Sequence, residues 1–312
     1  MDRLLVTGGS GLLGGNVAYL GGTRFNTRFT YNLHQVSIGN CTGVRMDLAE
    51  RKSVEAVVRE FSPHLIIHTA ALLGRQCEDN PALAQTTNGE GTRYLVESAK
   101  EVGSKFIYIS TDWIFDGVKE LNTEDDEPNP LNEYGRTKLM GEQAVQESGV
   151  NHCIIRTSLY GWNLRVGKLS FQERALDSLE KSEEFYAPDD QFYNPILVNI
   201  LGEALLEIYR KDVMGILNVA STEACSRYQF CRTMAAVFGL NDDLIKPIAL
   251  SPDYFGMPVP KHQSLDVAKA KKSLETRLPG IREGLLEMKR LRDNGYVARL
   301  RGEGTDSQSK GT

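Results

Sequence analysis

Residues 4–14 of the chain read LLVTGGSGLLG, an apolar run that passes directly into a turn with spaced glycines. Gly8 permits a tight turn, Gly11 lets the backbone approach a ligand, and Gly14 lets the following helix lie close to the sheet. The free N–H groups at the start of that helix favour phosphate groups. Because the turn follows a predicted strand and opens a predicted helix, it indicates binding of a dinucleotide pyrophosphate rather than a purely structural turn.

Short apolar runs alternate with helical patterns beyond this turn. The predicted strands span residues 3–7, 28–31, 43–46, 64–68, 105–109, 152–156 and 216–219. The predicted helices span residues 53–61, 91–102, 133–147 and 198–210. Several of the strands are apolar throughout, as expected of parallel strands that are covered on both faces. The alternation predicts an α/β fold with a Rossmann-type, doubly wound parallel sheet.

The regular alternation weakens half-way along the chain, which predicts a second, smaller region. We expect residues 1–164 and 195–221 to form the NAD(P)-binding Rossmann domain. Residues 165–194 and 222–300, which contain loops around several prolines, are predicted to form a smaller α/β substrate-binding lobe. The polar residues 301–312, rich in Gly and Ser, are predicted to form a disordered tail.

Composition argues against several classes of function. The net charge of the 312 residues is −5 and no basic run stands out, so we expect no nucleic-acid surface. No apolar stretch approaches the roughly 18 residues of a membrane span, and the first residues do not resemble a signal peptide. The five cysteines are scattered and form no C-x-x-C, which is typical of reduced thiols. These features predict a cytoplasmic protein.

A Tyr-x-x-x-Lys pair lies in the predicted helix 133–147. Tyr134 and Lys138 would lie one turn apart on one helix face. A tyrosine phenol has a pKa near ~10, and an adjacent ammonium stabilises the phenolate and lowers that pKa. Lys138 can also hold ribose hydroxyls, while Tyr134 protonates a carbonyl oxygen as hydride reaches the carbon. Thr111 follows a predicted strand at the edge where ligands of such sheets bind, so it can polarise the same carbonyl.

The end of the second predicted strand bears on the choice of cofactor. Residues 28–34 read RFTYNLH and lack the Asp or Glu that binds the ribose 2′-hydroxyl in NAD-preferring sites. The absence of a carboxylate, with polar Asn32 and His34 and nearby Arg28, favours NADP over NAD. Asp47 can accept a hydrogen bond from the adenine amino group, or it can cap the following helix, and both roles are compatible.

Four stretches of the sequence carry a resemblance to a known family. They are residues 7–14, STDWIFDG at 110–117, PLNEYGRTK at 130–138 and RTSLYG at 156–161. They resemble the extended short-chain dehydrogenase/reductases, and within them the dTDP-4-dehydrorhamnose reductase-like, sugar nucleotide-binding branch. The resemblance covers roughly residues 1–290 in order. It implies a Rossmann domain with a small sugar-nucleotide lobe and NADPH as hydride donor.

The resemblance also implies roles for individual residues. Thr111, Tyr134 and Lys138 would be the catalytic set. The cofactor would be bound by the glycine turn, by residues after the strands and by one helix, namely Gly8, Gly11, Leu12, Leu13, Gly14, Asn32, Asp47, Leu48, Ala70, Ala71, Asn88, Tyr134 and Lys138. The substrate would be bound by Asp112, Trp113 and Leu159.

Two departures and two alternatives shape the functional hypothesis. Leu159 stands where family members often carry Trp, which leaves the sugar open, and Trp113 stands where related dehydratases carry Glu, which argues against dehydration. The first hypothesis is an NADPH-dependent reductase of a 4-keto-6-deoxy sugar nucleotide. The alternatives are a non-catalytic regulatory subunit, resembling the β subunit of methionine adenosyltransferase, and a sugar-nucleotide epimerase.

Partners and metals are less well defined by the sequence. We expect a sugar-nucleotide substrate, with a homodimer as the candidate assembly. The branch sometimes uses Mg²⁺ at a subunit contact, but the sequence offers no ligand set for Mg²⁺ and we predict no metal. His64 and His68 lie on one predicted strand without a carboxylate or cysteine to complete a site, so we expect them to pack within the fold.

Overall fold

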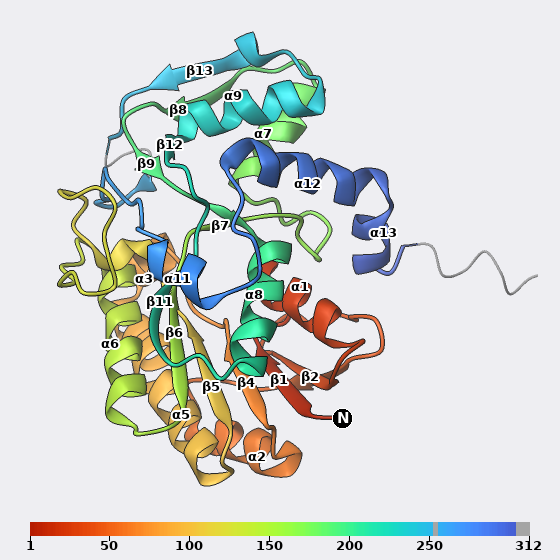
Figure 1. Cartoon of the computed structure of the whole chain (residues 1–312), viewed down its shortest axis with the longest axis vertical. Coiled ribbons are helices and arrows are strands. Elements are labelled where there is room, and N and C mark those ends of the chain that lie inside the picture. The colour runs from red at the N-terminus through yellow and green to blue at the C-terminus, as the bar shows by residue number, and fades with distance from the viewer. Residues whose placement is uncertain (252–254, 304–312) are drawn as a thin grey trace, which may run out of the picture.

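A seven-stranded parallel sheet forms the centre of the computed structural model, which describes residues 1–251 and 255–303 (Figure 1). The strand order is β11-β6-β5-β4-β1-β2-β3. The strands are β1 (Arg3–Thr7), β2 (Asn26–Tyr31), β3 (Thr42–Arg45), β4 (Leu65–His68), β5 (Lys105–Ile109), β6 (His152–Arg156) and β11 (Gly215–Asn218). This arrangement confirms the predicted Rossmann-type α/β fold.

Helices cover both faces of the sheet. α1 (Leu12–Gly21) and α8 (Val198–Arg210) pack together on one face, and α2 (Arg51–Phe61), α5 (Gly91–Glu101) and α6 (Glu133–Glu147) lie on the other. The strand residues alternate between two buried clusters: Leu4 and Val6 belong to one cluster, and Leu5 to the other. Burial on both faces explains why these strands are apolar throughout.

Short helical segments connect the elements on the carboxyl side of the sheet. α3 (Arg75–Asp79), α4 (Pro81–Ala84) and the π-helix η1 (Gln85–Glu90) lead from β4 into α5. The 3₁₀ turn η2 (Asp112–Ile114) follows β5. A π-turn within a helix often marks a functional position, and η1 packs against α6.

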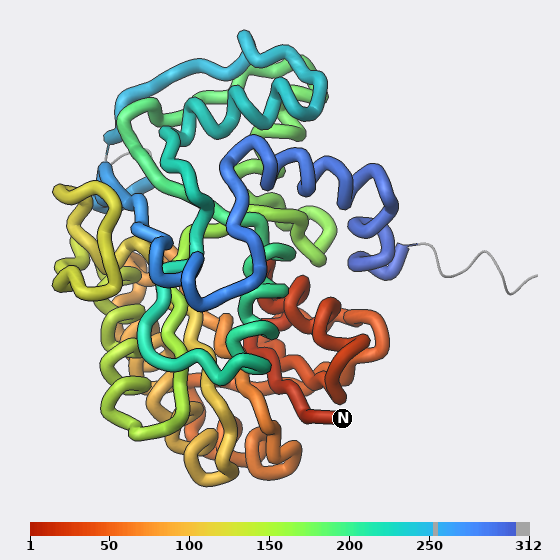
Figure 2. Tube along the Cα trace, viewed as in Figure 1, coloured from red at the N-terminus to blue at the C-terminus, as the bar shows by residue number. Residues whose placement is uncertain are grey.

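Small strand pairs and four helices form a C-terminal lobe (Figures 1 and 2). The lobe pairs are β8 (Phe185–Pro188) with β13 (Ile245–Ile248) and β9 (Phe192–Tyr193) with β12 (Cys225–Ser226). A further pair, β7 (Leu159–Tyr160) with β10 (Ile196–Leu197), lies in segments that the sequence assigns to the Rossmann domain. The lobe helices are α7 (Phe171–Glu180), α9 (Arg227–Phe238), α12 (Ile281–Asp293) and α13 (Tyr296–Leu300). The turn η3 (Asp242–Leu244) precedes β13, and α11 (Ala268–Ser273) contacts β11.

One buried cluster runs from the sheet into the lobe. Val6 of β1, Leu201 of α8, Phe230 of α9 and Met288 of α12 all belong to it. The lobe therefore rests on the sheet through a shared apolar core. Arg301, the first residue of the predicted tail, donates from Nε to the carbonyl oxygen of Asn163 at 3.1 Å. The remainder of that prediction, residues 304–312, lies outside the described residues.

No helix in the described part of the chain is long and apolar enough to cross a membrane. This agrees with the apolar run lengths in the sequence.

Candidate functional site

The glycine turn between β1 and α1 has the conformation that its sequence predicts. Gly8 has a φ of +73°, which favours glycine, and a Cβ there would lie 2.8 Å from the Cα of Ala70. A Cβ at Gly14 would lie 2.3 Å from the carbonyl oxygen of Gly8, so helix and turn are in direct contact. No side chain caps the start of α1 at Gly11. The first N–H groups of α1 are therefore open to an anion.

The turn lies where the strand order reverses. β1 has β2 on one side and β4 on the other, so the connections on its two sides run in opposite directions. Ligands of open α/β sheets bind at the carboxyl edge beside such a switch point. Ala70 and Ala71 follow β4 at this point, and the N–H of Ala70 donates to the hydroxyl of Thr7 at 3.2 Å. Leu12 and Leu13 open α1.

Asn32, Asp47 and Leu48 lie farther along the same edge, after β2 and β3. Asn32 is exposed, Leu48 is buried, and Asp47 is half-buried. The Asp47 carboxylate accepts from the N–H of Ala49 at 2.9 Å, whereas Glu50 holds the N-cap position of α2. The alternative role of Asp47 as the helix cap is therefore wrong, since its carboxylate closes a local turn instead.

The Arg28 side chain does not face the carboxyl edge of the sheet, where it was expected to favour NADP. Its guanidinium forms an ion pair with Glu60 at 2.7 Å and lies 4.6 Å from the ring centroid of Phe61, both on α2. The argument that Arg28 favours NADP is therefore removed. Arg45, the last residue of β3, is exposed and pairs in register with Tyr31 at the end of β2.

Thr111, Asp112 and Trp113 follow β5 at the carboxyl edge. The Thr111 hydroxyl accepts from the N–H of Trp113 at 3.2 Å and donates to Oδ1 of Asp112 at 3.1 Å. The Asp112 carboxyl is 2% exposed, and Oδ2 has no hydrogen-bond partner in residues 1–251 and 255–303. Burial raises the pKa of Asp112 to about 7, although Thr111 and the charge of Arg227 act in the opposite direction.

Tyr134 lies in the first turn of α6, beside this group. Its ring packs edge-on against Trp113 with the ring centroids 5.8 Å apart. Burial raises the pKa of the Tyr134 phenol above its usual value, and the Thr111 hydroxyl acts to lower it. The phenol is therefore protonated at neutral pH, as a proton donor must be. The helix begins here because the Asn132 side chain accepts from the N–H of Gly135 at 2.8 Å.

Lys138 lies one turn farther along α6 and is 3% exposed. Burial lowers the pKa of its ammonium to about 7, and the carboxylate of Glu142 acts to raise it. Nζ lies 4.1 Å from the ring centroid of Tyr108 on β5. The Nζ group makes neither a hydrogen bond nor an ion pair with any residue that the structure describes. A buried cation without a hydrogen-bond acceptor is a place where a ligand hydroxyl can bind.

Asn88 lies in η1 behind the Tyr134–Lys138 helix and is 1% exposed. Its amide exchanges hydrogen bonds with the backbone of Leu72, accepting at 2.8 Å and donating at 3.1 Å. It also donates to the Thr137 hydroxyl at 3.0 Å. Asn88 therefore ties the loop after β4 to α6 and acts on the positions of other site residues.

Leu159 lies in β7 and is half-buried against the main core. The structure brings Thr111, Tyr134 and Trp113 together at the carboxyl edge.

Arg227 is a lobe residue whose surroundings the sequence did not reveal. Its guanidinium lies 4.6 Å from the ring centroid of Tyr193, 5.0 Å from that of Phe171 and 5.4 Å from that of Phe255. Nε donates to Gln191 at 2.6 Å. These partners come from three separate segments, so no local motif could have signalled the cluster. In contrast, Lys261 forms an exposed ion pair with Asp190.

His68 is buried on β4, as predicted, and is hydrogen-bonded. Nδ1 lies 2.7 Å from the Thr7 hydroxyl and Nε2 lies 3.0 Å from the Thr92 hydroxyl. Burial lowers the pKa of the imidazole well below its usual range, which keeps it neutral. No group of His, Cys, Asp and Glu in the described ranges could hold a metal ion.

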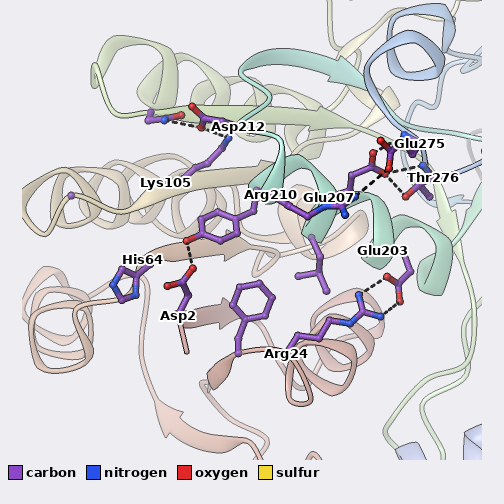
Figure 3. Close-up of a pocket in the computed structure, with 15 residues that line it drawn as sticks. Asp2, Arg24, His64, Lys105, Glu203, Glu207, Arg210, Asp212, Glu275 and Thr276 are labelled. Atoms are coloured by element: carbon purple, nitrogen blue, oxygen red, sulfur yellow. Dashed lines mark hydrogen bonds and ion pairs between the residues drawn. The ribbon is translucent and has the colours of Figure 1, made fainter.

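A concave region with a volume of about 1150 Å³ opens at the amino edge of the sheet, opposite the glycine turn (Figure 3). Its charged side chains pair with one another: Arg24 with Glu203 at 2.6 Å, and Lys105 with Asp212 at 2.7 Å. Glu207 accepts from the N–H of Thr276 at 2.8 Å. This cavity is far from the glycine turn, and its charges are already neutralised.

A doubly wound sheet with a glycine turn at its switch point is the architecture of the Rossmann-type dinucleotide-binding proteins. The model of the family described as RmlD substrate binding domain matches residues 2–292, so the chain belongs to that family. The resemblance to the extended short-chain dehydrogenase/reductases is thereby confirmed.

Individual relatives cover most of the chain. Methionine adenosyltransferase 2 subunit beta of Xenopus tropicalis is 31% identical, over 91% of this chain and 87% of that protein. The dTDP-4-dehydrorhamnose reductase of Sinorhizobium fredii is 29% identical, over 76% of this chain and 83% of the enzyme. The structure of the Bacillus anthracis dTDP-4-dehydrorhamnose reductase in complex with NADP matches with a TM-score of 0.79 and 26% identity, over 93% of this chain and 99% of that one. Similar structures hold NADP or NAD.

Proposed function

We propose that this protein is an NADPH-dependent reductase that transfers a hydride to the ketone of a 4-keto-6-deoxy sugar nucleotide. The observation that carries the proposal is the Lys138 ammonium, which is buried one helical turn from the Tyr134 phenol without a hydrogen-bond acceptor among the residues that the structure describes. Thr111 lies against the same phenol, and the glycine turn is at the same edge of the sheet. The match to dTDP-4-dehydrorhamnose reductases supports the substrate class.

The residues of the site fit a nicotinamide dinucleotide. A Cβ at Gly8 or Gly14 would fill the turn, and the open N–H groups of α1 suit a pyrophosphate. Lys138 is available for the hydroxyls of the nicotinamide ribose. NADPH, when bound, supplies the hydride that reduces the carbonyl carbon.

Protein side chains supply the proton and the polarisation. Tyr134 holds a proton on Oη and donates it to the carbonyl oxygen, so hydride and proton together convert the ketone to an alcohol. The Lys138 ammonium stabilises the phenolate that remains. The Thr111 hydroxyl orients the carbonyl oxygen beside Oη. Burial of these groups excludes water and strengthens each charge interaction.

The choice of NADP rests on the ends of β2 and β3. No carboxylate follows β2 to repel a 2′-phosphate, since residues 32–35 are Asn, Leu, His and Gln. Arg45 is exposed at the end of β3, where its charge is available to that phosphate. We therefore propose Arg45, rather than Arg28, as the cation that favours NADP.

We keep the predicted domain division as part of this proposal. The Rossmann domain, residues 1–164 and 195–221, would bind the cofactor, and the lobe, residues 165–194 and 222–300, would bind the sugar nucleotide. Arg227 is a lobe cation whose charge acts on Asp112, and its guanidinium suits an anionic or hydroxyl-rich ligand.

The test is Tyr134→Phe, assayed by NADPH oxidation with dTDP-4-keto-6-deoxy sugars. We expect kcat to fall by about 10²–10⁴-fold, because proton donation is lost, while NADPH affinity is unchanged. Tyr209→Phe is the matched control, because Tyr209 bonds Asp2 at the amino edge and should leave kcat intact. Full activity of Tyr134→Phe would refute the mechanism, and product analysis by NMR would reveal an epimerase.

A second candidate function follows from one comparison. The 31% identity to methionine adenosyltransferase 2 subunit beta extends over 91% of the chain, so a role as a subunit of such an enzyme is a specific alternative. Co-purification with a catalytic methionine adenosyltransferase from the same organism tests it. A stable complex together with no reduction of any keto sugar would favour the subunit role.

A further inference from the structure

We infer that Tyr108 is a positioning residue that holds Lys138 at both ends, its ring facing the ammonium and its hydroxyl bound to the lysine main chain. The inference rests on the proposed function, because it assigns Tyr108 to the proton-transfer site. Tyr108 belongs to β5, upstream of the Thr111–Asp112 pair.

Two contacts from one side chain define this role. Nζ of Lys138 lies 4.1 Å from the centroid of the Tyr108 ring, within the range of a cation–π interaction. The Tyr108 hydroxyl donates to the carbonyl oxygen of Lys138 at 3.1 Å. Tyr108 is 0% exposed and Lys138 is 3% exposed, so both contacts are shielded from water. A desolvated cation–π contact is stronger than an exposed one.

Gly141 provides the space that the Tyr108 hydroxyl occupies. A Cβ at residue 141 would lie 2.1 Å from Oη and 2.6 Å from Cζ of Tyr108. Any larger residue at position 141 would therefore displace the Tyr108 ring from Lys138. Gly141, Tyr108 and Lys138 therefore pack together between β5 and α6.

Other titratable groups near Lys138 do not replace the ring. They come from three elements, namely Tyr134 and Glu142 on α6, His68 on β4 and Cys77 on α3. Glu142 is already bound to Arg156 at 2.9 Å. His68 is neutral because burial lowers its pKa, and Cys77 is protonated because burial raises its pKa to about 11. The Tyr108 ring, in contrast, lies directly against the ammonium.

The electrostatic consequence is a bias toward the charged lysine. Burial favours the neutral amine of Lys138, whereas the negative face of an aromatic ring favours the ammonium. Without the ring, Lys138 would lose its proton at lower pH, and with it the charge that stabilises a Tyr134 phenolate. Tyr108 therefore keeps the site in its active protonation state toward neutral pH.

The test compares three substitutions of Tyr108 in the full chain. Tyr108→Leu and Tyr108→Met remove the ring and should lower the pKa of Lys138 by about one unit, whereas Tyr108→Phe keeps the ring and should leave that pKa unchanged. The pKa is measured without cofactor, from the pH dependence of Lys138 acetylation by acetic anhydride, followed by peptide mass spectrometry. Phe106→Leu, a buried ring on the same face of β5, is the control and should shift nothing.

Activity provides the second readout. In Tyr108→Leu and Tyr108→Met, kcat should fall at neutral pH and the alkaline limb of its pH profile should move to lower pH. Tyr108→Phe should restore the wild-type profile, which a merely structural loss would not do. An unchanged Lys138 pKa in the Leu and Met variants overturns the inference. If neither the Leu nor the Met variant folds, Tyr108→Phe decides the test. A Lys138 pKa that shifts by one unit in this variant overturns the inference, and an unchanged Lys138 pKa supports it. Absence of any reductase activity in the wild type would refute the proposed function alone, since the labelling needs no substrate.

Discussion

The amino and carboxyl edges of the central sheet differ in how their buried charged side chains are paired. At the amino edge, Lys105 is 6% exposed on its side chain but forms an ion pair with Asp212 (Figure 3). At the carboxyl edge, Lys138 is 3% exposed and its ammonium faces the ring of Tyr108. Within the described ranges, neither this ammonium nor Oδ2 of Asp112 has a hydrogen-bond partner. Both edges bury a lysine, but only one of them neutralises it.

This difference separates a structural cavity from a ligand site better than volume does. Burying a charge without a partner costs free energy, so a fold retains such a group only where something else compensates. At the amino edge, charged side chains of the protein form ion pairs with one another, so these charges need no ligand. The carboxyl edge leaves a cation and a carboxyl oxygen unpartnered beside a glycine turn, where a bound dinucleotide and substrate would satisfy them.

The largest expected effect at the carboxyl edge, after loss of the Tyr134 phenol, comes from Gly14→Ala. Its Cβ would lie 2.3 Å from the carbonyl oxygen of Gly8, so turn and helix must separate. Overpacking costs about 1–3 kcal/mol, and NADPH affinity should fall about tenfold to a hundredfold. Gly202→Ala is the control, because its Cβ would come close to the flexible end of Leu20 and would make an ordinary contact with Val17. Fluorescence titration with NADPH measures both, and equal affinities would argue against the turn as the binding site.

At the amino edge, Glu207→Gln should change stability and nothing else. Burial would raise the pKa of Glu207, but hydrogen bonds from Lys211, Thr276 and backbone N–H groups lower it to about 2. Loss of these charge-assisted bonds should cost about 1.5–3 kcal/mol at neutral pH. Denaturant unfolding measures this cost, with the exposed Glu203→Gln as a control expected to cost about 0–1 kcal/mol.

The pH dependence of that effect has a definite sign. The folded pKa of Glu207 is lower than the unfolded value of ~4.3, so its contribution is fully present above that value and is lost as pH falls toward about 2. Glu207→Gln should therefore approach the wild type in stability at acid pH. A change in NADPH affinity in this variant would contradict the structural role of the amino edge.

Asp112→Asn should change the pH dependence of stability at the carboxyl edge. The folded pKa of Asp112 is raised to about 7 by burial, so the unfolded chain ionises first, from ~3.9 upward. Wild-type stability should therefore fall as pH rises between these values and then level off. Asparagine cannot ionise, so the variant should lose this slope, and its stability relative to the wild type should increase as pH rises across this range. Thermal unfolding across this range measures the effect, and an unchanged slope would show that Asp112 ionises normally.

Most of the sheet could be predicted from the sequence because its signals are local. Apolar runs fixed β5 and β6, and the helical period fixed α6 and α8, with the bounds that the structure has. β2 begins two residues earlier than predicted, at Asn26, because pairing with Arg3 extends it beyond the apolar run. The lobe was placed only coarsely, since pairs such as β9 with β12 have two residues per strand and depend on tertiary contacts.

The sequence predicted the parts of the candidate site that lie in contiguous motifs. It missed the contacts between residues that are far apart in the chain. The glycine turn and the Tyr134–Lys138 spacing are read directly from neighbouring residues. Tyr108 lay within a predicted core strand, and nothing local signals that its ring meets a lysine 30 positions later. The prediction that Arg28 favours NADP failed for the same reason, because only the packing of α2 shows that Glu60 binds Arg28. A hint for Tyr108 existed in Gly141, a glycine in mid-helix that requires an explanation.

The contrast between the two edges is tested most directly by one matched pair of variants, Lys138→Met and Lys105→Met. NADPH affinity and thermal stability are measured for both. We predict that Lys138→Met weakens NADPH binding about tenfold or more without lowering the unfolding temperature, because it removes an unpartnered buried cation. Lys105→Met should lower the unfolding temperature and leave NADPH affinity unchanged. The opposite pattern, with cofactor affinity lost at Lys105 and retained at Lys138, would contradict the account.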